Sequence, residues 1–190
     1  MLINLYQKEM KLFSFKSILI LCLFCIGSQN VYSQQRRLIN YTEIGALLQH
    51  TNSLNNNSEI TGFRTRTGVT KIIDGHFGLG IALGTDNYRN ASGSNYNTLP
   101  ITINAAYYLK SDLSGLRGDV YGGYAVKLFN NFNRGLTAGA GISYAFYINN
   151  GLNLGIQTGY NYQKIDFPPT FIENGFNMGS FRLGLGITFK

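Results

Sequence analysis

Bulky apolar residues alternate with small or polar residues along most of this chain. In residues 77–85 the bulky positions are all odd, and the even positions hold Gly78, Gly80, Ala82 and Gly84. Because successive side chains of a strand point to opposite faces, such a strand has one apolar face and one nearly bare face. Glycine and alanine are unusual on a face in water, but they suit the narrow interior of a barrel whose apolar face meets lipid.

The same alternation predicts eight strands separated by turn and loop residues. They span about residues 38–50, 61–73, 77–88, 98–109, 117–128, 136–148, 152–164 and 178–189. No segment after residue 33 has a helical period. The connections near Asp74, Lys110 and Asn149 are short, whereas the other four, including residues 87–97, are longer. This pattern predicts an all-β fold, an eight-stranded antiparallel up-and-down transmembrane β-barrel.

The N-terminal segment has the features of a secretory signal peptide. Lys8, Lys11 and Lys16 precede an apolar run over residues 18–27, which is too short to span a bilayer, and Ser33 is a small residue at the exit. We expect residues 1–33 to be cleaved and residues 34–190 to form the barrel domain, with translation starting at Met1 or Met10. An uncleaved anchor is a weaker alternative. A lipoprotein acylated at Cys22 or Cys25 is weaker still, since no small residue directly precedes either cysteine.

Composition narrows the class further. Charged residues make up 13% of the chain, against roughly 25% in soluble domains, and aromatic residues make up 14%. Both cysteines lie in the leader, so we expect the mature chain to have no disulfides. The basic residues are scattered rather than clustered in a stripe, which gives no indication of nucleic-acid binding.

Several segments resemble those of small outer-membrane β-barrel proteins of the OmpA, OmpX and OmpW types. The resemblance rests on the signal peptide and on residues 41–46, 78–89, 107–110, 159–162 and 182–189. It implies a porin-like membrane protein of the Gram-negative cell envelope, located in the outer membrane. It also implies contact with outer-membrane lipids, insertion by the barrel-assembly machinery and a monomeric state. No cofactor, metal or enzymatic activity is implied. The final residue, Lys190, departs from the aromatic terminus typical of such barrels.

Charged residues on the inward parity form the first candidate site. An arginine on the lipid face at mid-membrane costs about 2–4 kcal/mol, so these residues are expected inside. They are Glu43, Arg64, Arg66, Asp119, Lys127 and Arg182. We expect Glu43 to lie between Arg66 and Arg182, because the first, second and eighth strands become neighbours when the barrel closes. The favoured interpretation is a structural ion-pair cluster that fills the interior, and the alternative is a gate or ion site.

Aromatic residues on the outward parity predict two membrane girdles. One set lies near the end that holds the short turns and comprises Phe77, Tyr107, Tyr144, Phe146 and Phe189. The other lies in the opposite halves of the strands and comprises Phe63, Tyr160, Tyr162 and Phe181.

Other chemistry is weakly indicated. The two histidines, His50 and His76, are expected at opposite ends, so they cannot share a metal site, and a hydrolase or acyltransferase built from His50 and Asp86 has no supporting geometry. The glycine runs lack phosphate-loop spacing. The favoured function is therefore a structural or surface-interaction role through extracellular loops. The alternatives are an OmpW-like narrow channel, transporter or binder of small hydrophobic molecules, and a secreted lipocalin-like barrel with its apolar face inward.

Overall fold

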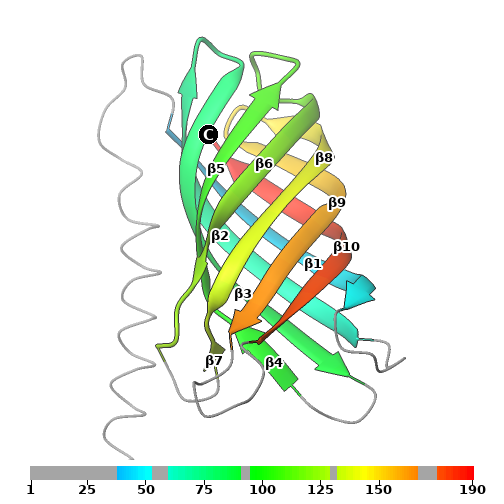
Figure 1. The fold of residues 1–190 in the computed structure, drawn as a ribbon. Helices are drawn as coiled ribbons and strands as arrows, with labels where there is room; N and C mark the ends of the chain where they lie inside the picture. Colours follow the sequence, from blue (N-terminus) through cyan, green and yellow to red (C-terminus); the bar gives the residue numbers. More distant parts are fainter. Residues whose placement is uncertain (1–37, 53–59, 91–94, 129–131, 167–174) are drawn as a thin grey trace, which may run out of the picture. The chain divides into compact units, whose positions relative to one another are not determined.

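The chain folds as a closed antiparallel β-barrel of eight long strands, accompanied by two short strands (Figure 1). The computed structural model describes residues 38–52, 60–90, 95–128, 132–166 and 175–190, all within the compact unit Arg36–Lys190. The long strands are β1 (Leu38–Asn52), β2 (Ile60–Ile73), β3 (Phe77–Asn90), β5 (Pro100–Tyr108), β6 (Gly115–Ala125), β8 (Gly135–Asn149), β9 (Leu152–Asp166) and β10 (Gly175–Phe189). The short strands are β4 (Asn95–Thr98) and β7 (Phe132–Asn133). The predicted signal peptide lies outside the described residues.

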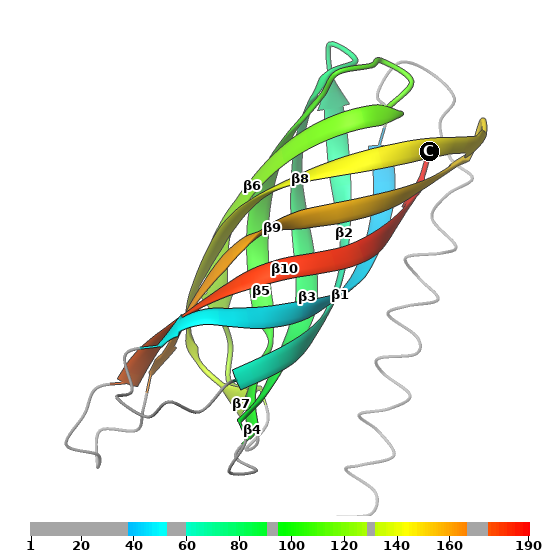
Figure 2. The ribbon, with the colours of Figure 1, turned by 90° about the vertical axis from the view of Figure 1, so that its right-hand side faces the viewer.

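Consecutive long strands pair as hairpins, and the first and last strands close the barrel. β1 pairs with β2 on one side and with β10 on the other, where Glu43 is opposite Arg66 and Gly186 respectively. Figure 2 shows β10 between β9 and β1, and the strands tilted against the barrel axis. This up-and-down order confirms the predicted eight-stranded barrel.

The two ends of the barrel differ. The "turn end" holds the start of β1, the end of β10 and the short connections β2–β3, β5–β6 and β8–β9. The "loop end" holds the other four connections together with β4 and β7, at the bottom of Figure 1. Short turns at one end and longer connections at the other agree with the predicted alternation.

The strands begin and end within a few residues of the predicted bounds, and two stretches differ in their pairing. The expected loop over residues 87–97 is partly strand, because β3 continues to Asn90 and Asp86–Arg89 pair with β4. The strand expected over residues 117–128 runs instead from Gly115 to Ala125, and β7 then pairs in parallel with β4. The apolar alternation continues through Val126, but pairing with β5 stops at Pro100, where the partner strand is interrupted.

The strands place their apolar residues outward and their polar residues inward. On β5, Ile101 and Ile103 are exposed, whereas Thr102 and Asn104 between them are buried. The same orientation holds along β3 and β10. A lipocalin-like barrel requires the opposite orientation, with the apolar face inside, so that alternative is wrong.

Two apolar layers close the interior above and below its polar middle. At the turn end, Ile39, Ile72, Ala106, Tyr108 and Leu113 form a buried cluster. At the loop end, a second buried cluster comprises Leu47, Tyr88, Ile165, Phe176 and Met178, with Tyr96 packed against it. The polar side chains of the middle therefore lie between two apolar clusters, and most of them are buried.

Leu113 reaches the interior from the β5–β6 turn. It has a left-handed backbone (φ 62°), is 1% exposed, and its carbonyl accepts a hydrogen bond of 2.9 Å from Asn153 Nδ2. Beside it, the N–H and the hydroxyl of Ser114 both donate to Asp112 Oδ1, which lowers the pKa of this carboxyl below its usual range. The turn thus folds into the barrel end as a small plug.

The described residues include no helix of sufficient length and hydrophobicity to cross a membrane.

Candidate functional site in the barrel interior

The middle of the interior holds four arginines and three acids from five strands. The arginines are Arg64, Arg66, Arg117 and Arg182, and the acids are Glu43, Asp86 and Asp119. All lie on the inward parity of their strands, since the outward position would put a charge on the apolar wall. Charges removed from water are costly unless they are paired and hydrogen-bonded, so their contacts determine what the site can do.

Arg64 and Asp86 form the most buried pair, directly across the β2–β3 ladder. Arg64 Nε donates to Asp86 Oδ1 at 2.7 Å and Nη2 to Oδ2 at 2.5 Å, and both side chains are 1% exposed. The remaining donors of Arg64 reach Tyr121 Oη at 2.6 Å and Asn161 Oδ1 at 2.8 Å, on the opposite wall. Asn161 in turn donates to Tyr88 Oη at 2.8 Å. This network joins β2, β3, β6 and β9 through the interior.

Glu43 lies between Arg66 and Arg182 in a second group. Its Oε1 is 3.7 Å from Arg66 Nε and 3.5 Å from Arg182 Nη1. Arg182 also contacts Asp119, with Nη2 3.2 Å from Oδ2, and Asp119 contacts Arg117 at 3.2 Å. The chain of charges runs from β2 through β1 and β10 to β6, so it crosses the barrel.

Tyr121 occupies the centre of both groups. The guanidinium carbons of Arg66, Arg64 and Arg182 lie 3.8, 5.3 and 5.5 Å from its ring centroid. A cation over an aromatic face within about 6 Å is stabilised by the ring quadrupole. The Tyr121 hydroxyl donates to Asn161 Oδ1 at 2.6 Å, which links the ring to the Arg64 network.

Two glycines of β8 make room for these large side chains. A Cβ at Gly139 would meet the hydroxyl of Tyr121, and a Cβ at Gly141 would meet Nη2 of Arg182. Both contacts would fall below van der Waals separation. The small residues on the inward face, which the sequence pattern shows, therefore leave the space that the large interior side chains fill.

The structure brings together five of the six predicted interior residues, Glu43, Arg64, Arg66, Asp119 and Arg182. The structure corrects the prediction that Lys127 lies in the interior. It lies two residues beyond the end of β6, is exposed, and has no ion pair within the described chain. The alternation of apolar residues continues past Ala125, the last paired residue of β6. Beyond that point, an odd or even position no longer shows on which side of the wall a residue lies.

Sequence reasoning missed several members of the site. Arg117 and Asp86 share the inward parity of Asp119 and Gly84, so their strand positions could have indicated an interior placement. Tyr121 and Asn161 carry no charge, and nothing in their sequence context shows that they meet across the barrel. Their pairing depends on the stagger of the closed sheet, which the alternation does not determine.

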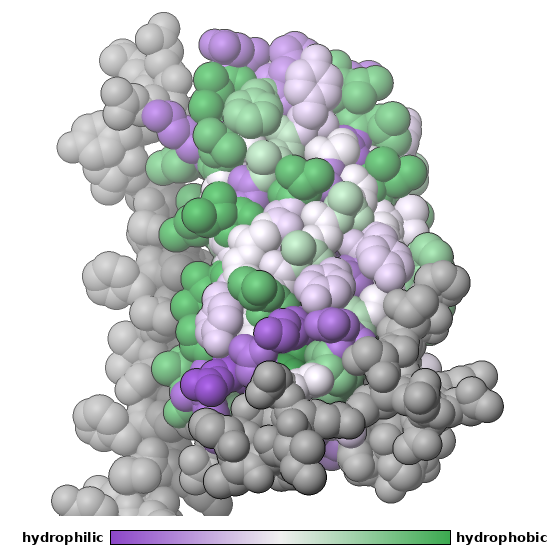
Figure 3. Space-filling view, in the orientation of Figure 1, coloured by the Kyte–Doolittle hydropathy of each residue, from purple (hydrophilic) through white to green (hydrophobic). Residues whose placement is uncertain are grey.

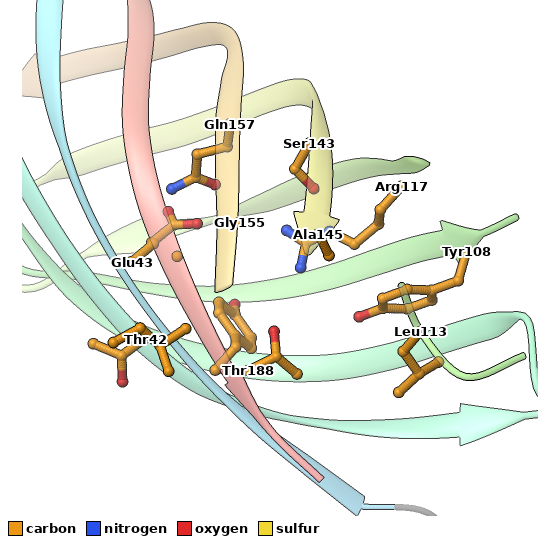
Figure 4. Close-up of a pocket in the computed structure, with 13 residues that line it drawn as sticks. Thr42, Glu43, Tyr108, Leu113, Arg117, Ser143, Ala145, Gly155, Gln157 and Thr188 are labelled. Carbon is orange, nitrogen blue, oxygen red and sulfur yellow. The ribbon is translucent and has the colours of Figure 1, made fainter. Parts of the chain in front are cut away.

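Two cavities among the described residues of this interior have room for water. One of about 30 Å³ lies toward the turn end, and Figure 4 shows Glu43, Gln157, Arg117 and Tyr108 directed into a common space from different strands. A second, of about 10 Å³, is lined by Arg66 and Asn104 among others. Arg66 Nη2 and Asn104 Oδ1 have no partner among the described residues, and one water needs roughly 10–15 Å³. Side chains therefore fill most of the described interior, and these two cavities could hold waters that satisfy the unpaired polar atoms.

All nine predicted girdle aromatics are exposed on the outer wall: Phe63, Phe77, Tyr107, Tyr144, Phe146, Tyr160, Tyr162, Phe181 and Phe189. Phe77 is opposite Tyr107 across the β3–β5 ladder, and the rings of Tyr160 and Phe181 meet edge to face at 5.6 Å. Figure 3 shows hydrophilic residues gathered mainly toward the two ends of the visible wall, with apolar and near-neutral ones between.

His76 has a structural environment. Its Nδ1 is 2.8 Å from the carbonyl oxygen of Tyr108, and its ring stacks on Tyr107. The side chain of His50 lies outside the described part of the chain, so the hydrolase alternative has no described partner for Asp86, which is bonded to Arg64. Within the described residues, no group of His, Cys, Asp and Glu could hold a metal ion.

Comparison with known proteins gives fold-level similarity only. No family model matches the chain, and no curated protein is similar to it. Among solved structures, Neisserial surface protein A has 18% identity and a TM-score of 0.49, covering 83% of this chain and 99% of that one. The N-terminal β-barrel domain of Pseudomonas aeruginosa OprF has 16% identity and a TM-score of 0.40, covering 82% and 98%. The outer membrane protein OprG of the same organism has 12% identity and a TM-score of 0.39, covering 80% and 95%.

The strand pairing itself defines the class, an eight-stranded antiparallel β-barrel. The chain is similar to small outer-membrane barrel proteins. At these identities and TM-scores, the likeness transfers no activity, ligand or partner to it.

Proposed function

We propose that this protein is an integral outer-membrane β-barrel with a closed interior, and that it acts structurally or through surface interactions of its extracellular loops. The chain would be exported by a cleaved signal peptide and inserted as a monomer by the barrel-assembly machinery. The loop end would face outward. The turn end, which holds the start of β1 and the end of β10, would face the periplasm.

The observation that carries the membrane assignment is the outer wall. Among the described residues, outward-facing charges occur only near the two ends, and the wall between them exposes leucine, isoleucine, valine and aromatic side chains. Ile103 is 69% exposed and Leu183 is 55% exposed, both on the wall between the ends. A water-facing surface usually carries about 25–35% charged residues. A continuous apolar belt with aromatic residues toward both ends is the pattern of a barrel in lipid.

The filled interior supports a structural or interaction role over transport. Two apolar clusters and the ion-paired middle occupy the described interior, and the two cavities between them are water-sized, which suits neither a hydrophobic ligand nor a continuous ion path. The long connections at the loop end are then the parts available for a partner.

Planar-bilayer recordings on refolded protein test this function. We expect the protein to float with lipid vesicles, to migrate differently in SDS before and after boiling, and to give no steady conductance. A steady conductance that persists across voltages would favour the channel alternative. Failure to associate with vesicles would contradict the membrane barrel itself.

A further inference from the structure

The charges on the outer wall are unequally distributed between the two ends. Near the turn end the exposed or partly exposed charged residues are Lys71, Asp74, Lys110, Asp112 and Lys190. Near the loop end the described ones are Arg89, Lys127, Arg134, Lys164 and Asp166. Within the described chain, the loop end therefore has four cations for one acid, whereas the turn end has three cations for two acids.

Three of the loop-end cations belong to the same part of the rim, where β6, β8 and β9 end or begin. Ala125 pairs with Gly135, and Lys127, two residues past Ala125, and Arg134, one residue before Gly135, both follow this last pair at the loop end. Arg134 bridges to Asp166 of β9, and the Asp166 N–H donates to the Arg134 carbonyl at 2.9 Å. Lys164 is on the same outward face of β9. We call Lys127, Arg134 and Lys164 the rim cations.

Only one described acid lies among the rim cations. Asp166 Oδ1 is 3.0 Å from Lys164 Nζ, and its Oδ2 accepts a hydrogen bond of 3.3 Å from Tyr124. Neither Lys127 nor Arg134 has an ion-pair partner in the described chain. The rim cations thus have an excess of two positive charges at the surface.

Apolar and aromatic residues lie directly below the rim cations on the same wall. Tyr124 of β6 is opposite Leu136 of β8, and Tyr162 lies one row further toward the middle, opposite Ala138. Tyr124 is 41% exposed and Leu136 is 55% exposed. This order, cations at the rim and then apolar wall, matches the order of headgroup and acyl chain in a lipid leaflet.

We propose that the rim cations bind a phosphate-bearing lipid headgroup in the leaflet at the loop end, with the acyl chains against Tyr124, Leu136 and Tyr162. This inference rests on the proposed membrane function. Arginine presents planar donors that suit phosphate oxygens, and lysine adds a point charge. Charge complementarity selects a phosphomonoester or another anionic headgroup over a zwitterionic one.

The test compares lipid retention by variants in mixed micelles, measured by native mass spectrometry with phosphatidic acid and phosphatidylcholine as probes. The rim variant carries Lys127→Gln, Arg134→Gln and Lys164→Gln. The matched control removes the same charge at the turn end with Lys71→Gln, Lys110→Gln and Lys190→Gln. Each surface cation contributes about fivefold to anionic-lipid affinity, so the rim variant should lose roughly 100-fold for phosphatidic acid while the control keeps most of it.

A variant of opposite sign sharpens the test. Asp166→Asn removes the acid beside Lys164 and should strengthen phosphatidic acid retention about fivefold. Inorganic phosphate at the same concentration should not displace the lipid, since it lacks the acyl contacts. Equal loss in the rim and control variants, or displacement by phosphate alone, would overturn the proposal. Parent protein that floats with vesicles yet retains both lipids equally would overturn this inference alone, whereas protein that does not float would overturn the membrane function as well.

Discussion

Arg64 and Asp86 form a two-point ion pair in the closed middle of the barrel, with both side chains almost fully removed from solvent. The carboxylate is the only acid within reach of this guanidinium among the described ion pairs. Tyr121 and Asn161 accept from the remaining donors, so the pair connects β2 and β3 to the opposite wall. The stability of the barrel should therefore depend on this pair more than on any surface charge.

Replacing the acid of this pair tests that dependence. Asp86→Asn keeps the shape but leaves Arg64 as a buried charge without a carboxylate, and breaking a buried pair costs about 3–5 kcal/mol. We expect a lower urea midpoint for unfolding from lipid vesicles. Asp74→Asn is the matched control, because Asp74 is exposed in the β2–β3 turn and asparagine tolerates its left-handed backbone (φ 50°). Equal midpoints for the two variants would refute the role of the pair.

Glu43→Gln should destabilise the barrel, but less than Asp86→Asn. Its contacts with Arg66 and Arg182 are longer, and Arg182 keeps Asp119 when Glu43 loses its charge. The double variant Glu43→Gln with Arg66→Gln should recover part of the loss, since it removes one of the two cations left facing each other. The same urea titration in vesicles measures both. If the double variant lost more unfolding free energy than the two single variants lose together, this pairing would be contradicted.

Gly139 tests the packing of the interior. Gly139→Ala would place a methyl group against the Tyr121 hydroxyl and 2.6 Å from the Tyr160 carbonyl oxygen, and such overpacking costs about 1–3 kcal/mol. Gly122→Ala on the outer wall is the control, because a Cβ there has no atom within 4 Å. We expect the control to leave the unfolding free energy unchanged or slightly higher. Similar losses for both variants would show that the interior has room to spare.

The outer wall is tested by placing a charge on it. Ile142 is exposed in the middle of β8, and Ile142→Arg should make folding into bilayers less favourable by about 2–4 kcal/mol. Ser111→Arg in the exposed β5–β6 turn should fold with the yield of the parent. Folding yield into liposomes, read from the heat-dependent shift in SDS gels, measures the difference. Full yield from Ile142→Arg would mean that this wall does not meet lipid.

The alternation along the chain was sufficient to predict the barrel, the number of long strands and the side of the wall on which most residues lie. It worked because side-chain direction in a strand has a period of two, so Glu43, Arg66 and Arg182 could be assigned to the interior together. It failed for Lys127, because periodicity does not show where pairing ends. The partners across the interior, such as Tyr121 with Asn161, depend on barrel stagger, which arises from closure rather than from local sequence.

The most direct test of a lipid-facing wall around a closed interior is spin-label accessibility along β5. The mature chain is expected to lack cysteine, so single labels can be placed at Ile101, Thr102, Ile103 and Asn104 in protein reconstituted in lipid. Collision rates are measured with oxygen, which partitions into lipid, and with a water-soluble nickel chelate. We predict high oxygen and low nickel accessibility at Ile101 and Ile103, and low accessibility to both at Thr102 and Asn104. Nickel accessibility at Thr102 and Asn104 would reveal a water-filled interior, and nickel accessibility at Ile101 and Ile103 would place this wall in water; either result would contradict the account.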